Sequence, residues 1–137
     1  MIEIYKNKNC FNKNEKRKKM NSSLLPFSNY FELKKESLKK EFAQFLAFQT
    51  ISAHKESLSA CKQCALWLQK KLFDMGFASS LWGDSFPPIV FGQWEGDPTL
   101  PTLLIYNHYD VQPVDPLEKW NSDPFIATME GDKIIAR

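Results

Sequence analysis

The chain has 137 residues, of which 43% are hydrophobic and 25% charged, values that fit a globular domain and exclude wholesale disorder. Its net charge of +2 is unevenly placed, because residues 1–20 hold six lysines and one arginine against two glutamates. That segment carries +5 and leaves −3 for the rest, so we expect a basic, disordered leader over 1–20 and a globular portion over 21–137.

Several protein classes fit the sequence poorly. No run approaches the roughly 18 apolar residues of a membrane span, and the beginning lacks the apolar stretch of a secretory signal. Three cysteines are too few for a disulfide framework, which favours a cytoplasmic protein. The leader could touch nucleic acid, but without a recognised nucleic-acid-binding fold we expect neither nucleic acid nor membrane as a partner. Translation could also begin at Met20.

Two helices are predicted first along the chain. Apolar side chains at helical spacing predict one helix over 28–49, capped by Ser28 or Asn29. Residues 48–52 are expected to lead from that helix into a loop, because Thr50, Ile51 and Ser52 favour extended structure over helix. A second helix is predicted over 58–75, with Ser57 or Ser59 as its cap and Gly76 as a left-handed end.

The remainder is predicted to form strands. Short strands are expected over 77–82 and 89–94, and an apolar run over 102–106 is typical of a strand buried on both faces. Residues 125–129 and 133–136 flank Gly131-Asp132 and predict a hairpin. Two helices followed by strands indicate an α/β fold with helices packed on a mixed β-sheet.

The segment after the apolar run carries the most chemical information. His108 and Asp110 are two residues apart, so an extended backbone would place both side chains on one face. An imidazole that binds a metal through one nitrogen usually has its other nitrogen held by a carboxylate or carbonyl. A His-x-Asp pair alone is a weak pattern, because one histidine does not make a zinc site.

The residues around this pair make the pattern more specific. They resemble the metallopeptidase family that contains carnosinases, aminoacylases, acetylornithine deacetylase and succinyl-diaminopimelate desuccinylase, and within it the dipeptidase branch. The resemblance rests on the element His108-Tyr109-Asp110-Val111-Gln112-Pro113, then Asp115-Pro116, Trp120 and Pro124-Phe125. It extends upstream through residues 101–106 and more loosely to the two helices, but not to the leader.

The resemblance implies a role for each matching residue. His108 corresponds to the first metal ligand of a two-metal site, and Asp110 to the catalytic-site carboxylate that supports it. The implied cofactors are two divalent ions, zinc first, with manganese or cobalt as alternatives. Asn107 and Ala136 stand where the family usually has glycine, which can matter locally because glycine accepts backbone angles that they accept less well.

The resemblance also implies that the chain is the amino-terminal part of an incomplete zinc-peptidase-like catalytic domain. The family's other ligands and its glutamate base lie beyond the position of Arg137. The implied function is hydrolysis of dipeptides or N-acyl amino acids by metal-activated water, often in homodimers. We expect little activity from this chain alone. The alternative is an inactive remnant or a partner-binding module.

Other candidate residues have plainer interpretations. Cys61 and Cys64 have the spacing of a redox or zinc motif, but they lie on the apolar stripe of the second helix and are expected to be buried core. His54 is expected to be solvated or capping. Three acidic residues around Trp120 are expected to be surface charges with the indole packed beneath them; they are Asp115, Glu118 and Asp123.

Overall fold

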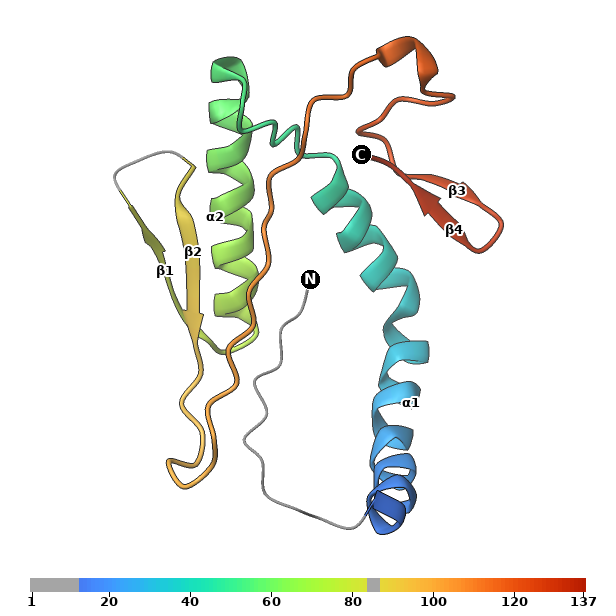
Figure 1. Cartoon of the computed structure of the whole chain (residues 1–137), viewed down its shortest axis with the longest axis vertical. Coiled ribbons are helices and arrows are strands. Elements are labelled where there is room, and N and C mark those ends of the chain that lie inside the picture. Colours follow the sequence, from blue (N-terminus) through green and yellow to red (C-terminus); the bar gives the residue numbers. More distant parts are fainter. Residues whose placement is uncertain (1–12, 84–86) are drawn as a thin grey trace.

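A computed structural model describes residues 13–83 and 87–137 of the chain, with side chains described from residue 26 onward (Figure 1). The elements in chain order are α1 (Lys13–Leu46), η1 (Lys55–Ser57), α2 (Leu58–Asp74), β1 (Ala78–Trp82), β2 (Ile89–Gln93), η2 (Leu117–Lys119), β3 (Thr128–Glu130) and β4 (Lys133–Ile135). The predicted α/β class is confirmed, and the arrangement is that of an incomplete α/β domain.

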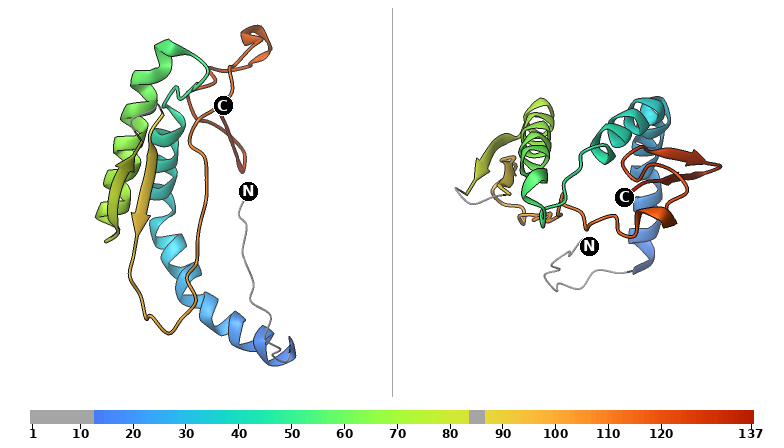
Figure 2. Two further views of the ribbon diagram at one scale, coloured as in Figure 1. Left: turned by 60° about the vertical axis from the view of Figure 1, so that its left-hand side comes forward. Right: turned by 90° about the horizontal axis from the view of Figure 1, so that it is seen from above.

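The first helix is longer than predicted. It begins at Lys13 instead of Ser28 and continues through Pro26, because the Lys, Glu, Met and Leu residues on that side are good helix formers. It therefore includes residues 13–20 of the predicted leader, while residues 1–12 lie outside those described. The amino-terminal half of α1 extends away from α2 and its strands (Figure 2). In the described part of the chain, no helix combines the length and apolarity needed to cross a membrane.

The second helix was predicted within one residue of its observed bounds and supplies most of the core, although the side chain of Ser57 at its N-cap makes no capping hydrogen bond. Cys61, Cys64 and Ala65 are fully buried along its inner face. Its end has the hydrogen bonds of a Schellman motif, in which the Phe77 amide donates to Leu72 O at 3.0 Å and the Gly76 amide donates to Phe73 O at 2.9 Å. Gly76 adopts a φ of 92°, which is the left-handed conformation predicted for it.

The strands form two separate antiparallel pairs in the described residues, where one mixed sheet was predicted. β1 pairs with β2 and packs against α2, while β3 pairs with β4 through the predicted Gly131-Asp132 turn. Gly92 of β2 allows the close approach to α2, since a Cβ there would lie 2.9 Å from Leu72 Cδ1. The strands 77–82 and 89–94 and the hairpin were thus predicted nearly at their observed bounds.

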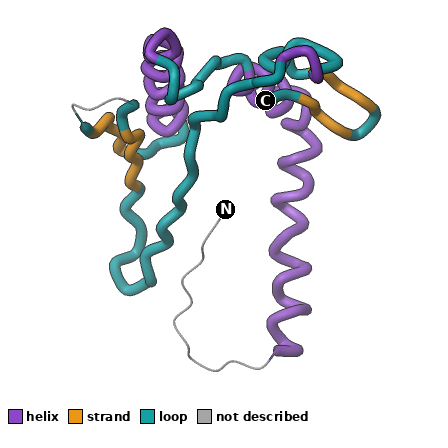
Figure 3. Tube along the Cα trace, turned by 45° about the horizontal axis from the view of Figure 1, so that its top comes forward, coloured by secondary structure: helices purple, strands orange, loops and turns teal. Residues whose placement is uncertain are grey.

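The predicted buried strand over 102–106 is wrong. Residues 101–110 have no regular secondary structure and form part of the long loop between β2 and β3 (Figure 3). Leu103 to Tyr106 are 61–76% exposed. An apolar run becomes a buried strand only when neighbouring strands and a covering layer are present, and β1–β2 does not extend to it.

Candidate metal centre

The His-x-Asp segment is held by the residues that follow α1. Ile51 and Val111 form a parallel bridge, and the Val111 amide donates to Thr50 O at 3.0 Å. The Thr50 hydroxyl donates to Tyr109 O at 2.7 Å from a position only 2% exposed. Residues 50–52 were predicted to favour extended structure; Thr50 and Ile51 run beside 109–111, whereas the chain turns at Ser52.

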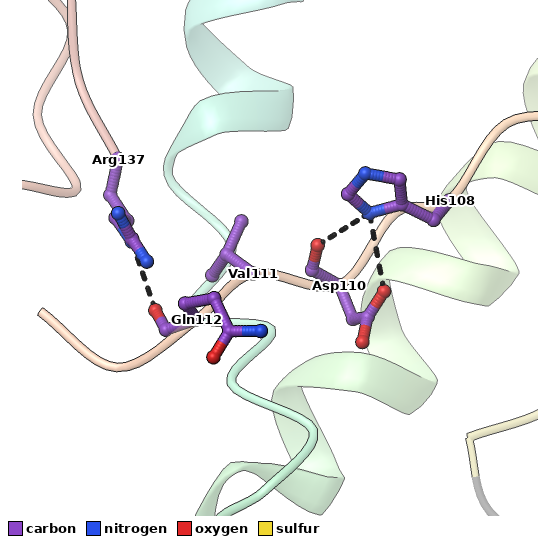
Figure 4. Close-up of a pocket in the computed structure, with 5 residues that line it drawn as sticks. All are labelled: His108, Asp110, Val111, Gln112 and Arg137. Carbon is purple, nitrogen blue, oxygen red and sulfur yellow. Dashed lines mark hydrogen bonds and ion pairs between the residues drawn. The ribbon is translucent and has the colours of Figure 1, made fainter. Parts of the chain in front are cut away.

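His108 and Asp110 do meet, as their spacing predicted. His108 Nδ1 lies 3.3 Å from Asp110 Oδ1 and 2.9 Å from the Asp110 backbone oxygen (Figure 4). Both neighbours of Nδ1 accept hydrogen bonds, so a neutral ring in this position carries its proton on Nδ1. Nε2 is then left with a lone pair, and Figure 4 shows it on the side of the ring away from Asp110. A carboxylate or carbonyl beside one ring nitrogen is also common among histidines that bind a metal through the other nitrogen.

Asp110 has a second partner that the sequence did not reveal. The Ser52 hydroxyl donates to Asp110 Oδ2 at 2.7 Å, so the two carboxylate oxygens face different groups. This hydrogen bond lowers the pKa of Asp110 below its usual value, with a smaller contribution from His108, while partial burial acts in the opposite direction. The carboxylate therefore stays ionised and able to accept the imidazole N–H.

Tyr109 anchors the segment from its other side. Its hydroxyl donates to Pro88 O at 2.6 Å, next to β2. Burial raises the pKa of Tyr109 to about 12, with further contributions from the nearby thiols of Cys61 and Cys64. Tyr109 thus joins the loop to the core under α2, while His108, with a side chain 74% exposed, faces outward.

A shallow pocket of about 310 Å³ lies beside the pair and is lined by His108, Asp110, Val111, Gln112 and Arg137. The Arg137 side chain reaches it from beyond β4, and its Nε donates to Gln112 O at 2.9 Å. Among residues 13–83 and 87–137 there is no group of three or more His, Cys, Asp or Glu side chains that could hold a metal ion. The donors present therefore fit one ligand position with its supporting carboxylate, and not a whole metal site.

The plainer interpretations of other candidates hold. Cys61 and Cys64 are reduced and buried, and burial raises the pKa of Cys64 to about 12. His54 is partly exposed at the start of η1, where its side chain makes no capping hydrogen bond. The Trp120 indole donates to Val114 O at 2.9 Å, and the acidic residues around it are exposed; they are Asp115, Glu118 and Asp123.

Comparison with known proteins finds several dipeptidases. No protein-family model matches the chain. The chain is 52% identical to the Cys-Gly metallodipeptidase of Schizosaccharomyces pombe over 45 residues, which are 33% of this chain and 10% of the relative. It is 37% identical to the human Beta-Ala-His dipeptidase over 51 residues, 37% of this chain and 10% of the relative.

A longer and weaker similarity covers more of the chain. A probable di- and tripeptidase of Saccharomyces cerevisiae is 27% identical over 121 residues, which are 77% of this chain and 13% of the relative. The chain thus spans only about a tenth of the length of the curated relatives that it matches. Over the part of the chain that they cover, these similarities support the metallopeptidase family of the carnosinases and its dipeptidase branch.

Proposed function

We propose that this chain is part of a metal-dependent dipeptidase in which His108 binds one of two divalent ions and Asp110 holds the ring. One observation carries the proposal: Nδ1 of His108 faces the carboxylate and backbone oxygen of Asp110, while Nε2 lies on the far side of the ring. The relatives are named as dipeptidases acting on Cys-Gly and β-Ala-His. Dipeptides or N-acyl amino acids are the proposed substrates.

The residues of this chain would act by orienting the ligand. In the proposed tautomer the Nδ1–H group donates to the Asp110 backbone oxygen at 2.9 Å, with the carboxylate 3.3 Å away, and Nε2 is left free to bind the metal. The divalent ions, when bound, supply the Lewis acidity needed for hydrolysis of a peptide bond. Zinc is the preferred candidate because it favours imidazole together with carboxylate ligands, and manganese and cobalt are alternatives.

Two further properties belong to this proposal. We propose a cytoplasmic location, which is supported by two buried cysteines that are not joined in a disulfide. Homodimers, the association that the family resemblance implies, are proposed for the whole protein.

The two histidines of the chain provide a direct test of the ligand, because His54 is a built-in control for His108. We propose titrating the ¹⁵N-labelled chain with Mn²⁺, a paramagnetic ion that broadens the signals of nearby amides. Residues 107–112 should broaden first in the wild type and in His54→Ala, and this broadening should disappear in His108→Ala. Unchanged broadening of 107–112 in His108→Ala would remove the basis of the proposal.

A second candidate function is partner binding by a catalytically inactive chain. The observation that favours it is the exposed apolar run from Leu103 to Tyr106, which is 61–76% exposed. Sequencing the gene downstream of the Arg137 codon discriminates between the two. An in-frame Gly-x-x-Asp-Asp-Lys-Gly element followed by a Glu-Glu pair supports the enzyme, and a stop codon without these elements supports the binding module.

A further inference from the structure

We propose that Ser52 is a positioning residue for His108 and that it acts through Asp110. This inference rests on the proposed role of His108 as a metal ligand. The contacts form a short series: Ser52 Oγ donates to Asp110 Oδ2 at 2.7 Å, and Asp110 Oδ1 lies 3.3 Å from His108 Nδ1. Ser52 itself does not need to touch a metal or a substrate.

The carboxylate needs such a partner because its terminal torsion is weakly restrained. The χ2 angle of an aspartate is broad, and an ionised carboxylate has about four acceptor positions that water can occupy. Asp110 is partly exposed, so without a second donor its carboxylate could rotate away from the imidazole. Holding Oδ2 leaves Oδ1 as the oxygen that faces Nδ1.

The position of Ser52 is itself determined by the backbone. The bridge between Ile51 and Val111, with the hydrogen bond from the Val111 amide to Thr50 O, sets the register of the two segments. A parallel register alone would place Ser52 beside Gln112, but the chain turns directly after Ile51, where the His54 amide donates to Ile51 O at 3.0 Å, and in this turn the Ser52 hydroxyl meets Asp110. The hydroxyl of Ser52 therefore reaches the carboxylate from a turn that directly follows two buried residues, Thr50 and Ile51, and its position does not depend on a long, flexible side chain.

The expected consequence is a bias in the tautomer of His108. A free imidazole in water favours the proton on Nε2, which would block the nitrogen needed for a metal. A well-placed carboxylate shifts the proton to Nδ1. The Asp110 backbone oxygen, 2.9 Å from Nδ1, favours the same tautomer and remains when Ser52 is changed. Loss of the serine hydroxyl should therefore reduce the Nδ1–H tautomer without abolishing it.

The test uses NMR of the metal-free 137-residue chain, with His54→Gln in every sample so that one imidazole remains. Long-range ¹H–¹⁵N spectra at pH 8.5, where an unperturbed imidazole is neutral, report the tautomer ratio. We expect mainly Nδ1–H in the parent chain and a several-fold lower Nδ1–H to Nε2–H ratio in Ser52→Ala and Ser52→Val. Ser52→Thr, which keeps the hydroxyl, should restore the ratio, and Asp110→Ala should give the largest shift.

Thr50→Val is the matched control, because it removes an equally short hydroxyl hydrogen bond to the same segment without touching the carboxylate. It should loosen the segment but leave the tautomer of the folded chain unchanged. The inference is overturned if the ratio stays constant in Ser52→Ala and Ser52→Val, or if Thr50→Val changes it as much. Since no metal is added, this result is independent of the Mn²⁺ experiment, and failure of the metal-ligand proposal would be seen separately.

Discussion

Thr50→Val should weaken the contact that holds the candidate ligand pair. The valine side chain has nearly the same shape, but it lacks the hydroxyl that donates to Tyr109 O at 2.7 Å. Thr50 is only 2% exposed, so water cannot readily replace the lost donor. A net cost of about 1 kcal/mol is expected, rising to about 2 kcal/mol if the carbonyl stays dry. These values correspond to roughly fivefold and thirtyfold changes in a local opening equilibrium.

Hydrogen exchange of the Val111 amide measures this opening, because that amide donates to Thr50 O across the same contact. Exchange of the Val111 amide should be roughly fivefold to thirtyfold faster in Thr50→Val than in the wild type. Thr128→Val is the control, since the Thr128 hydroxyl bonds Ile126 O at 3.2 Å in an exposed position and its loss should change stability by less than about 0.5 kcal/mol. Unchanged protection of Val111 in Thr50→Val, or equal loss in both variants, would refute the reasoning.

Two further predictions follow from the core and from the exposed run. Burial raises the pKa of Cys64 to about 12, so the folded state disfavours the thiolate. The free energy of unfolding should stay constant below about pH 9, near the ordinary pKa of a thiol, and should fall between about pH 9 and 12 by up to about 1.4 kcal/mol per pH unit. Urea unfolding should show a flatter fall in Cys64→Ala, and parallel curves would contradict the prediction. The chain should also bind a hydrophobic dye and aggregate, and Leu104→Lys should reduce dye fluorescence more than Leu33→Lys on α1, although both residues are exposed. A monodisperse chain that ignores the dye would contradict this.

The elements that the sequence predicted well are those stabilised by local interactions. The helical period of α2 and the glycine at its end need only neighbouring residues, and the same holds for the turn at Gly131, where φ is 62°. The run over 102–106 has the composition of a buried strand, but burial depends on partners that local sequence does not specify. The α1 helix continues through Pro26, although proline inside a helix removes a backbone hydrogen bond.

In the candidate site, too, the contacts between residues close in sequence were predictable and the contacts between distant residues were not. The approach of His108 to Asp110 was predictable because two residues of extended chain place side chains on one face. Their roles as ligand and supporting carboxylate remain predictions. Ser52 and Thr50 were not found, because 58 and 59 residues separate them from the groups they bond and no spacing rule joins such positions. The only signal was the preference of residues 50–52 for extended structure, which permits the pairing but does not choose its partner.

For the proposed role of His108 as a metal ligand, the contact between residues 50–52 and 109–111 bears on whether the ring is oriented before or during metal binding. The groups described above as orienting the His108 ring, Asp110 and Ser52, come from those two short segments. The orientation of the ring therefore does not require a bound cation. Freezing a mobile side chain during capture typically costs about 0.5–1.5 kcal/mol. Much of that entropic cost would already be met when the chain folds. Metal binding by His108 would then be binding to a pre-organised ligand, without folding of the segment being coupled to it.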